Sequence, residues 1–165
     1  MRPVSRERSL IDTARVTSRP DDRSESRPAL LVSACLLGTR CNHEAGHSRR
    51  SAVEALAETH LLVPVCPEVC GGLSTPRPAA ERVGERVVNV AGEDVTDAYE
   101  RGARAAVELA IAVGAQRAVL KARSPSCGAH EVYDGSFSRT LRPGEGVTAA
   151  ALRAAGVEVV SEDEV

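Results

Sequence analysis

The eight residues KARSPSCG, at positions 121–128, follow directly after the apolar run AVL at positions 118–120. The apolar run predicts a short buried strand, and the Ser, Pro and Gly residues predict a turn after it. Open α/β sheets bind their ligands at the carboxyl ends of strands, where such turns lie. We therefore expect Cys127 to lie in a functional loop at one edge of a parallel sheet.

Two earlier apolar runs also end on a cysteine. The run from Leu30 to Ala34 leads directly to Cys35, and the run from Leu61 to Val65 leads directly to Cys66. Neighbouring strands of a sheet lie about 4.8 Å apart, so cysteines that follow nearby parallel strands can reach one small inorganic centre. The sequence thus predicts three thiols at one sheet edge.

Strand and helix patterns alternate along the rest of the chain. This alternation predicts a single α/β domain, a Rossmann-like three-layer sandwich with a mainly parallel sheet. Pro64 in the second strand predicts an edge position. We expect Ala103, Val107, Ala110 and Ile111 to form the buried face of the long helix. We expect Ser51 to cap a helix that precedes the second strand. After the second strand, we expect a strand at 86–90, a helix at 98–113, a strand at 115–120, a helix at 147–155 and a strand at 157–160.

The bulk composition limits the classes of function. Of the 165 residues, positions 1–28 are rich in charge and poor in apolar side chains, so we expect a disordered N-terminal extension before an α/β domain at 29–165. The net charge of −2 gives no drive toward nucleic acid or an anionic membrane. No apolar run approaches the roughly 20 residues of a membrane span, and the N-terminus lacks a signal-peptide core. We expect a cytoplasmic protein, monomeric or homodimeric, with an aliphatic core.

The five cysteines are an odd number, and in a reducing compartment they favour metal ligands or nucleophiles over disulfides. None forms the CxxC pair of a zinc ribbon or a thioredoxin-like site. Iron–sulfur clusters take thiolate ligands, and a cubane held by three would leave one iron open as a Lewis acid. The alternative is that several cysteines are small buried apolar residues. Spacing alone leaves Cys41 open as a ligand beside Cys35.

Other polar side chains near these cysteines are candidates for chemistry. Glu68 lies two residues after Cys66 and is the best candidate acid or base. Ser124 and Ser126 could bond a substrate or cap the turn around Pro125. His43 and His47 are four residues apart in a loop, a weak metal-ligand pattern from which we expect no metal site.

Several sequence blocks, taken together and in order, resemble the thiouracil desulfidase family from about residue 30 to the C-terminus. The blocks are SACLLG at 33–38 with Cys41, CPEV at 66–69, GGL at 71–73, PR at 76–77, GEDVT at 92–96, LK at 120–121, SPSCG at 124–128, YDG at 133–135 and GEGVTA at 144–149. The chain departs from the family pattern after Cys41. The family usually has a basic residue there, followed by Tyr, then Asp or Asn, and then Gly, whereas this chain has NHEAG at 42–46. Cys70 lies outside the pattern.

The resemblance implies a desulfidase with a [4Fe-4S] cluster held by Cys35, Cys66 and Cys127. It implies that Glu68 and Ser124 are a catalytic pair and that Cys41 is a further active-site thiol. The implied reaction is the non-redox desulfuration of a small thiolated uracil or related thioamide, in which the open iron accepts the sulfur and water replaces it. Two alternatives remain open: a cysteine-nucleophile sulfur transferase or hydrolase without iron, and a non-catalytic metal-binding module.

Overall fold

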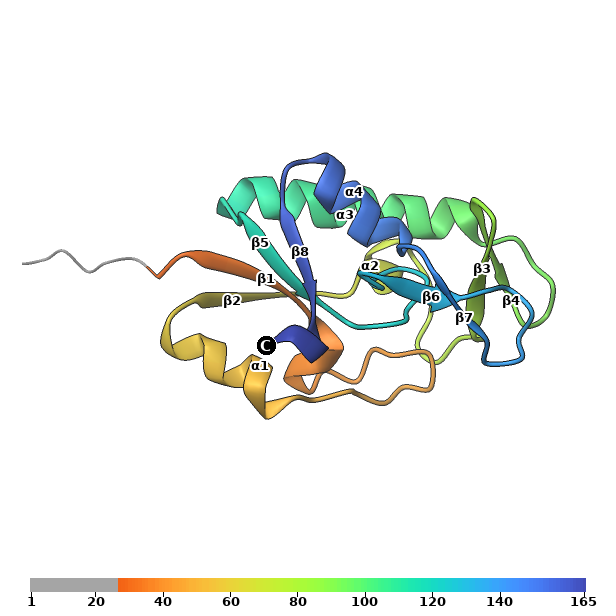
Figure 1. The fold of residues 1–165 in the computed structure, drawn as a ribbon, viewed down its shortest axis with the longest axis horizontal. Helices are drawn as coiled ribbons and strands as arrows, with labels where there is room; N and C mark the ends of the chain where they lie inside the picture. Colours follow the sequence, from red (N-terminus) through yellow and green to blue (C-terminus); the bar gives the residue numbers. More distant parts are fainter. Residues whose placement is uncertain (1–26) are drawn as a thin grey trace, which may run out of the picture.

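The main sheet of the computed structural model has four parallel strands in the order β2-β1-β5-β8 (Figure 1). The structure describes residues 27–165, so the expected disordered extension at 1–28 lies almost entirely outside the described residues. Pro64 lies in the edge strand β2, as expected. The four strands are β1 Ala29–Ser33, β2 Leu61–Val65, β5 Arg117–Leu120 and β8 Glu158–Ser161.

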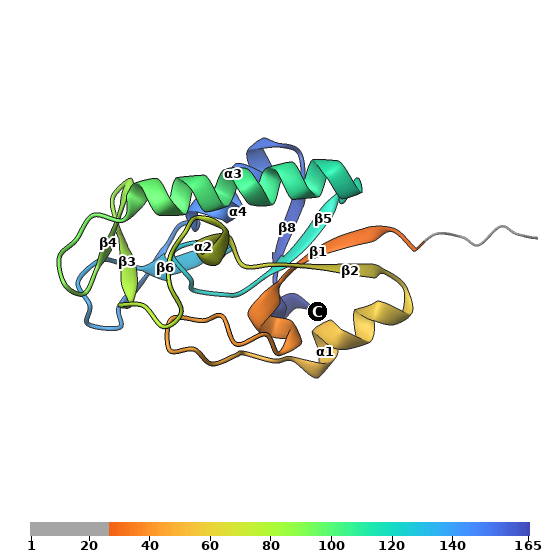
Figure 2. The same cartoon turned by 180° about the vertical axis from the view of Figure 1, so that it is seen from behind.

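Helices cover both faces of this sheet, which confirms the three-layer α/β architecture (Figures 1 and 2). Alternate residues of β1 point to opposite layers, because successive side chains of a strand face opposite sides. Leu31 packs in the core beneath the long helices, and Leu30 and Val32 pack in the core beside the short one. The helices are α3 Thr96–Val113 and α4 Val147–Ala154 on one face, and α1 Ser51–Ala55, continued by the 3-10 turn Leu56–Glu58, on the other.

The short helix α2, Pro67–Cys70, lies against α3 with almost no space between the two backbones. A Cβ atom at Gly102 of α3 would overlap the Pro67 carbonyl oxygen. Glycine at this position therefore lets α2 rest on α3. Because α2 begins directly after Cys66 and carries Glu68, this contact positions both residues.

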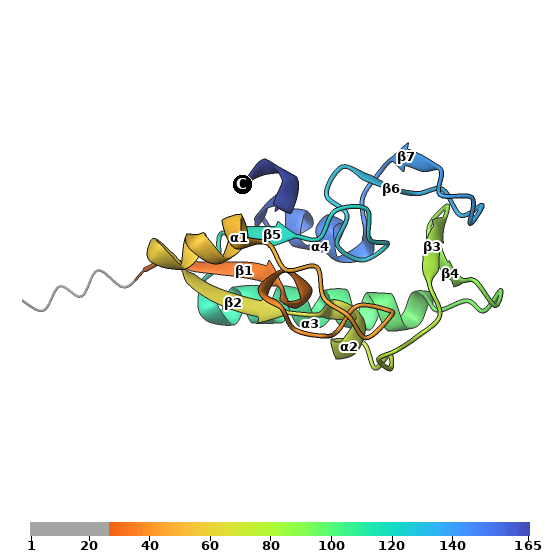
Figure 3. The ribbon, with the colours of Figure 1, turned by 90° about the horizontal axis from the view of Figure 1, so that it is seen from below.

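Two antiparallel hairpins extend the molecule beyond the carboxyl ends of the main strands (Figure 3). The first hairpin, β3 Ala80–Val83 with β4 Arg86–Asn89, confirms the strand expected at 86–90. Its first arm was not predicted, because the prolines before residue 80 indicate an irregular loop. The second hairpin joins β6 Glu131–Tyr133 to β7 Leu141–Pro143.

Two details of the helices differ from the sequence expectation. Ser51 is the first residue of α1, and Arg50 takes the N-cap position without a side-chain cap. Ile111 was expected in the core but is 70 % exposed. Ala103 and Ala110 are buried as expected, and Gly102 and Ala106 complete the buried stripe of α3, which packs against both α2 and α4. None of the helices at 27–165 has both the length and the apolar character that a membrane crossing requires.

Candidate active site

A cavity of about 700 Å³ opens at the carboxyl ends of β1, β2 and β5. The structure brings all six predicted site residues to its wall: Cys35, Cys41, Cys66, Glu68, Ser124 and Cys127. The two hairpins supply the opposite wall. A second hollow, of about 370 Å³, lies between α3 and α4 and contains none of these six residues. The chemistry predicted from the sequence therefore belongs to the larger cavity.

The thiols reach the cavity from three strand ends. Cys35 lies in the 3-10 turn η1 (Ala34–Leu37) after β1, Cys66 caps α2 after β2, and Cys127 lies in the loop after β5. Cys41 lies in the loop after η1, and its carbonyl accepts a hydrogen bond from Cys66 Sγ at 3.7 Å. All five cysteines are free, and Cys70 is exposed and outside the cavity wall.

The environment of these thiols favours their neutral form while no metal is bound. Burial raises the pKa of Cys127 to about 12, although a hydrogen bond with Ser33 opposes this rise. A hydrogen bond with Cys35 is the largest cause that raises the pKa of Cys41 to about 11. A hydrogen bond with Cys41, followed by burial, raises the pKa of Cys66. A bound metal would displace these protons, because the thiolate is the metal ligand.

The arrangement fits a multi-iron centre better than a single ion. A single zinc ion needs its ligand atoms about 2.0 to 2.3 Å away. Among residues 27–165, no group of three or more His, Cys, Asp or Glu side chains could hold one metal ion. The three strand-end thiols instead surround a cavity, and in an iron–sulfur cluster each thiolate binds a different iron. The residues present therefore fit an iron–sulfur cluster.

Glu68 forms an ion pair with Arg77, in which Arg77 Nε lies 2.6 Å from Glu68 Oε2. The side chains are only 14 % and 5 % exposed, respectively, so this pair is shielded from water. Arg77 Nη2 also donates a hydrogen bond to the Cys41 carbonyl, at 2.9 Å. Arg77 thereby connects the candidate base to the loop that carries the fourth thiol.

Tyr99 and Arg77 are site residues that sequence analysis did not identify. Tyr99 of α3 lines the cavity, and burial, followed by the charge of Glu68, raises its pKa. Arg77 had one signal in the sequence, its place in the PR block at 76–77. Tyr99 had none, because its contact with Glu68 joins residues of different helices.

Ser124 organises the loop that carries Cys127. Its Oγ accepts hydrogen bonds from the backbone N–H groups of Ser126 and Cys127, both at 3.1 Å. The hydroxyl proton remains available to donate into the cavity. Ser126 is fully buried and its Oγ lies 2.9 Å from Thr148 Oγ1, so it does not face a substrate.

Ser33 holds two strand ends together and was also missed from the sequence. It is buried at the end of β1, and its Oγ accepts the Lys121 backbone N–H at 2.9 Å. Lys121 directly follows β5. This side-chain bond fixes the start of the loop that leads to Cys127.

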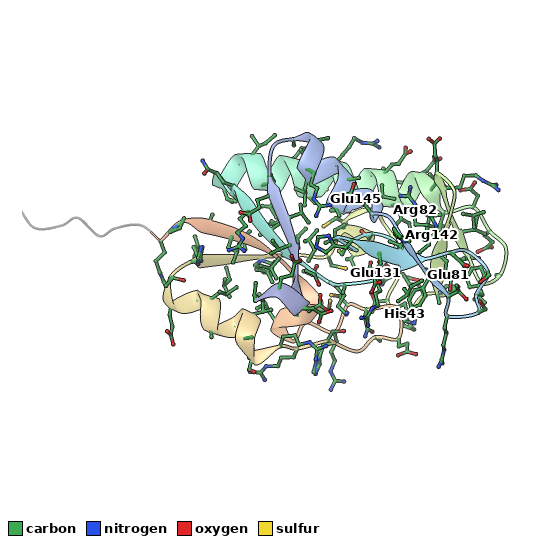
Figure 4. All side chains as sticks on the ribbon, in the orientation of Figure 1. His43, Glu81, Arg82, Glu131, Arg142 and Glu145 are labelled. Carbon is green, nitrogen blue, oxygen red and sulfur yellow. The ribbon has the colours of Figure 1, made fainter. Side chains whose placement is uncertain are left out.

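The loop after Cys41, in which the sequence departs from the family pattern, is stabilised by hydrogen bonds to the side chain of Asn42. Asn42 Oδ1 accepts backbone hydrogen bonds from Gly46 at 2.6 Å and Glu44 at 3.1 Å. The backbone N–H of Arg77 donates a hydrogen bond to the His43 carbonyl at 2.9 Å. Figure 4 shows His43 and Glu81 at the hairpin end of the molecule, and both residues line the cavity.

The fold and the cavity define a class of protein: a parallel α/β sheet whose strand-end cysteines meet at one site. The family model described as 2-thiouracil desulfurase matches residues 30–164, and the chain belongs to this family and is an enzyme. It is 39 % identical over 145 residues to "Uncharacterized protein YbbK" of Bacillus subtilis (strain 168), covering 82 % of this chain and 96 % of that relative.

A solved structure with the same fold is described as the [4Fe-4S]-dependent thiouracil desulfidase TudS. It matches with a TM-score of 0.79 and 44 % sequence identity, covering 84 % of this chain and 93 % of that chain. The resemblance to the thiouracil desulfidase family and the α/β fold class are therefore confirmed.

Proposed function

We propose that this enzyme desulfurates a thiolated uracil without redox chemistry, using a [4Fe-4S] cluster held by Cys35, Cys66 and Cys127. The observation that carries the proposal is the convergence of these three strand-end thiols with Glu68 on one cavity. The solved neighbour at 44 % identity, described as [4Fe-4S]-dependent, supports the same cofactor here.

The cofactor would supply Lewis-acid chemistry that the chain itself lacks. When bound through three thiolates, such a cluster offers one iron with an open position for the thiocarbonyl sulfur. The overall exchange replaces that sulfur with the oxygen of water. The carbon–sulfur bond breaks, a carbon–oxygen double bond forms, and the sulfur leaves at the sulfide level. The carbon keeps its oxidation state, so no electron donor is needed.

Glu68 would take a proton from the attacking water and return it as the sulfur leaves. Its ion pair with Arg77 fixes Oε2 of the carboxylate, so we assign this transfer to Oε1. Ser124 would orient the substrate, because its Oγ already accepts two backbone hydrogen bonds and its own proton is free to be donated. Cys41 would remain a neutral thiol beside the ligands.

The raised thiol pKa values support this proposal over a cysteine nucleophile. Reactive cysteines have lowered pKa values, whereas the pKa values of Cys41 and Cys127 are raised to about 11 and about 12. Without a metal, both side chains would be weak nucleophiles at neutral pH.

Anaerobic purification followed by iron and sulfide analysis, with 2-thiouracil turnover measured on the same sample, tests the proposed function. We expect about four irons and four sulfides per chain, as the proposed cluster requires, and loss of uracil formation when iron is removed. Turnover that survives iron removal, with an adduct on a thiol, would establish the cysteine-nucleophile alternative. Stoichiometric metal without turnover would establish the non-catalytic binding module.

A further inference from the structure

All the aromatic side chains of this chain line the same cavity. The sequence contains two Tyr, one Phe and no Trp. Tyr99 of α3, Tyr133 of β6 and Phe137 of the turn between β6 and β7 are all part of the cavity wall. The two cores on either side of the sheet are aliphatic. Aromatic surface is therefore concentrated where the substrate would bind.

Phe137 has a backbone conformation that needs an explanation. Its φ is 55°, in the left-handed region, and its side chain is 37 % exposed. A bulky residue rarely adopts a positive φ, and such strain persists only where the surrounding structure enforces it. The side chain belongs to neither core cluster, so core packing does not explain its placement.

A buried carboxylate enforces this conformation. Glu81 of β3 is buried, and its Oε2 accepts the backbone N–H groups of Gly135 and Phe137, both at 3.0 Å. Gly135 has a φ of 92°, and a Cβ atom there would lie 2.7 Å from Val83 Cγ2. The turn is thus fixed against β3 by one acceptor and one close approach. This fixed turn presents Phe137 to the cavity.

We propose that Phe137 is a substrate-contacting residue that stacks on the planar ring of the thiolated pyrimidine, and that Glu81 is the positioning residue that presents it. The proposal rests on the proposed function and adds the basis of substrate selection, which is the aromatic ring as well as the thiocarbonyl. Aromatic side chains bind nucleobases through their faces, and every base offers such a face.

Kinetics of the anaerobic holoenzyme on two matched thiocarbonyl compounds test the stacking. The compounds are 2-thiouracil and its 5,6-dihydro analogue, whose saturated ring lacks an aromatic face. For Phe137→Ala we expect KM for 2-thiouracil to rise about 5- to 150-fold, the range for one lost base stack, with kcat and iron content retained. We expect KM for the dihydro analogue to change less than about threefold, because it has no stack to lose.

Three further variants separate stacking from apolar contact and from folding. Phe137→Leu keeps apolar volume and should lose the preference for 2-thiouracil over the dihydro analogue, as Phe137→Ala does. Phe137→Tyr should keep this preference. Leu141→Ala is the matched control, because Leu141 is also 37 % exposed on the same hairpin but lies outside the cavity wall. An equal loss on both substrates, or full recovery in Phe137→Leu, would overturn the stacking.

The positioning role of Glu81 has its own readout. Glu81→Ala should raise KM for 2-thiouracil as Phe137→Ala does, and Glu81→Gln, which keeps an acceptor oxygen, should restore it. The double variant Glu81→Ala with Phe137→Ala should be no worse than Phe137→Ala alone. Additive losses, or a Glu81→Gln variant as weak as Glu81→Ala, would overturn the role.

A binding measurement separates failure of this proposal from failure of the proposed function. The product uracil and dihydrouracil can be titrated calorimetrically into the wild type and Phe137→Ala without any turnover. If the wild type shows no desulfuration but binds uracil through Phe137, the proposed function fails and the stacking stands. If uracil binds equally to both proteins, or to neither, the stacking fails.

Discussion

The two walls of the cavity are built in different ways. The thiol wall, which carries Cys35, Cys66 and Cys127, belongs to the ends of strands in the four-stranded sheet. Its strands are covered by core residues on both faces. The hairpin wall, formed by β3/β4 and β6/β7, consists of two two-stranded sheets. Hydrogen bonds accepted by Glu81 of β3 join its two hairpins to each other.

This difference separates two demands on an active site. Ligands of a metal centre must be held in fixed geometry, which a rigid, fully packed sheet provides. A substrate wall must match the shape of the substrate, and loops on a rigid scaffold suit that role. Changes to the cysteines of the thiol wall should therefore abolish cofactor and activity together, whereas changes in the hairpin wall should alter substrate affinity and leave the iron content unchanged.

The largest effect is expected for Cys127→Ser in the thiol wall. A serine hydroxyl does not replace a thiolate as a cluster ligand, so the variant should lose iron, brown colour and 2-thiouracil turnover together. Iron analysis and absorbance of the anaerobic protein measure the loss. Cys70→Ser is the control, because Cys70 is exposed and outside the cavity, and it should keep both iron and activity. Full iron content in Cys127→Ser would refute the ligand assignment.

The next effect is expected for Glu68→Gln, which keeps the shape of the side chain and removes its charge. Losing a general acid or base lowers kcat by roughly 10²- to 10⁴-fold, and the iron content should stay unchanged. Single-substrate kinetics beside iron analysis measure both quantities. Glu108→Gln on the exposed face of α3 is the control and should have wild-type kcat. A Glu68→Gln enzyme with wild-type kcat would remove Glu68 from the proton transfer.

The thiol wall was predictable from the sequence because its signals are local. Each ligand candidate directly follows an apolar run, and parallel strands place their carboxyl ends at one edge. Those two facts predicted that Cys35, Cys66 and Cys127 would converge, and the structure places them around one cavity. The division of roles between Cys41 and Cys35 was not contained in the spacing and rested on family resemblance.

The hairpin wall was not predictable because its contacts join distant residues. Glu81 and Phe137 are 56 positions apart, and nothing in the local pattern of either residue indicates the hydrogen bond between them. Arg77 and Glu68 are closer in sequence, yet their ion pair depends on the irregular loop at 71–79. Side-chain pairing across loops is therefore set by the tertiary fold and leaves no local signal in the sequence.

A smaller effect, confined to the hairpin wall, is expected for Gly135→Ala. The added Cβ would lie 2.7 Å from Val83 Cγ2 and 2.9 Å from the Arg82 carbonyl at a φ of 92°, so the turn must shift. We expect a loss of about 1–3 kcal/mol in the free energy of unfolding from the strained backbone. KM for 2-thiouracil should rise several-fold, while iron content stays at the wild-type level.

Gly84→Ala is the matched control for this change. Gly84 also has a positive φ, of 62°, but a Cβ atom there would meet nothing within 4 Å. The two variants share the cost of a positive φ and differ in the clash near the cavity. Gly84→Ala should therefore keep the wild-type KM, and equal KM values in both variants would show that the turn does not shape the substrate wall.

The smallest effect on the enzyme itself concerns the metal-free form of the thiol wall. The pKa of Cys41 is raised to about 11, chiefly through its hydrogen bond with Cys35. Alkylation requires the thiolate, so labelling of Cys41 by iodoacetamide should rise about tenfold for each pH unit between pH 8 and pH 10. Peptide mass spectrometry of the iron-free protein measures this slope. A labelling rate that levels off below pH 9 would show that this thiol ionises readily. The thiol wall would then already contain a thiolate before any metal binds.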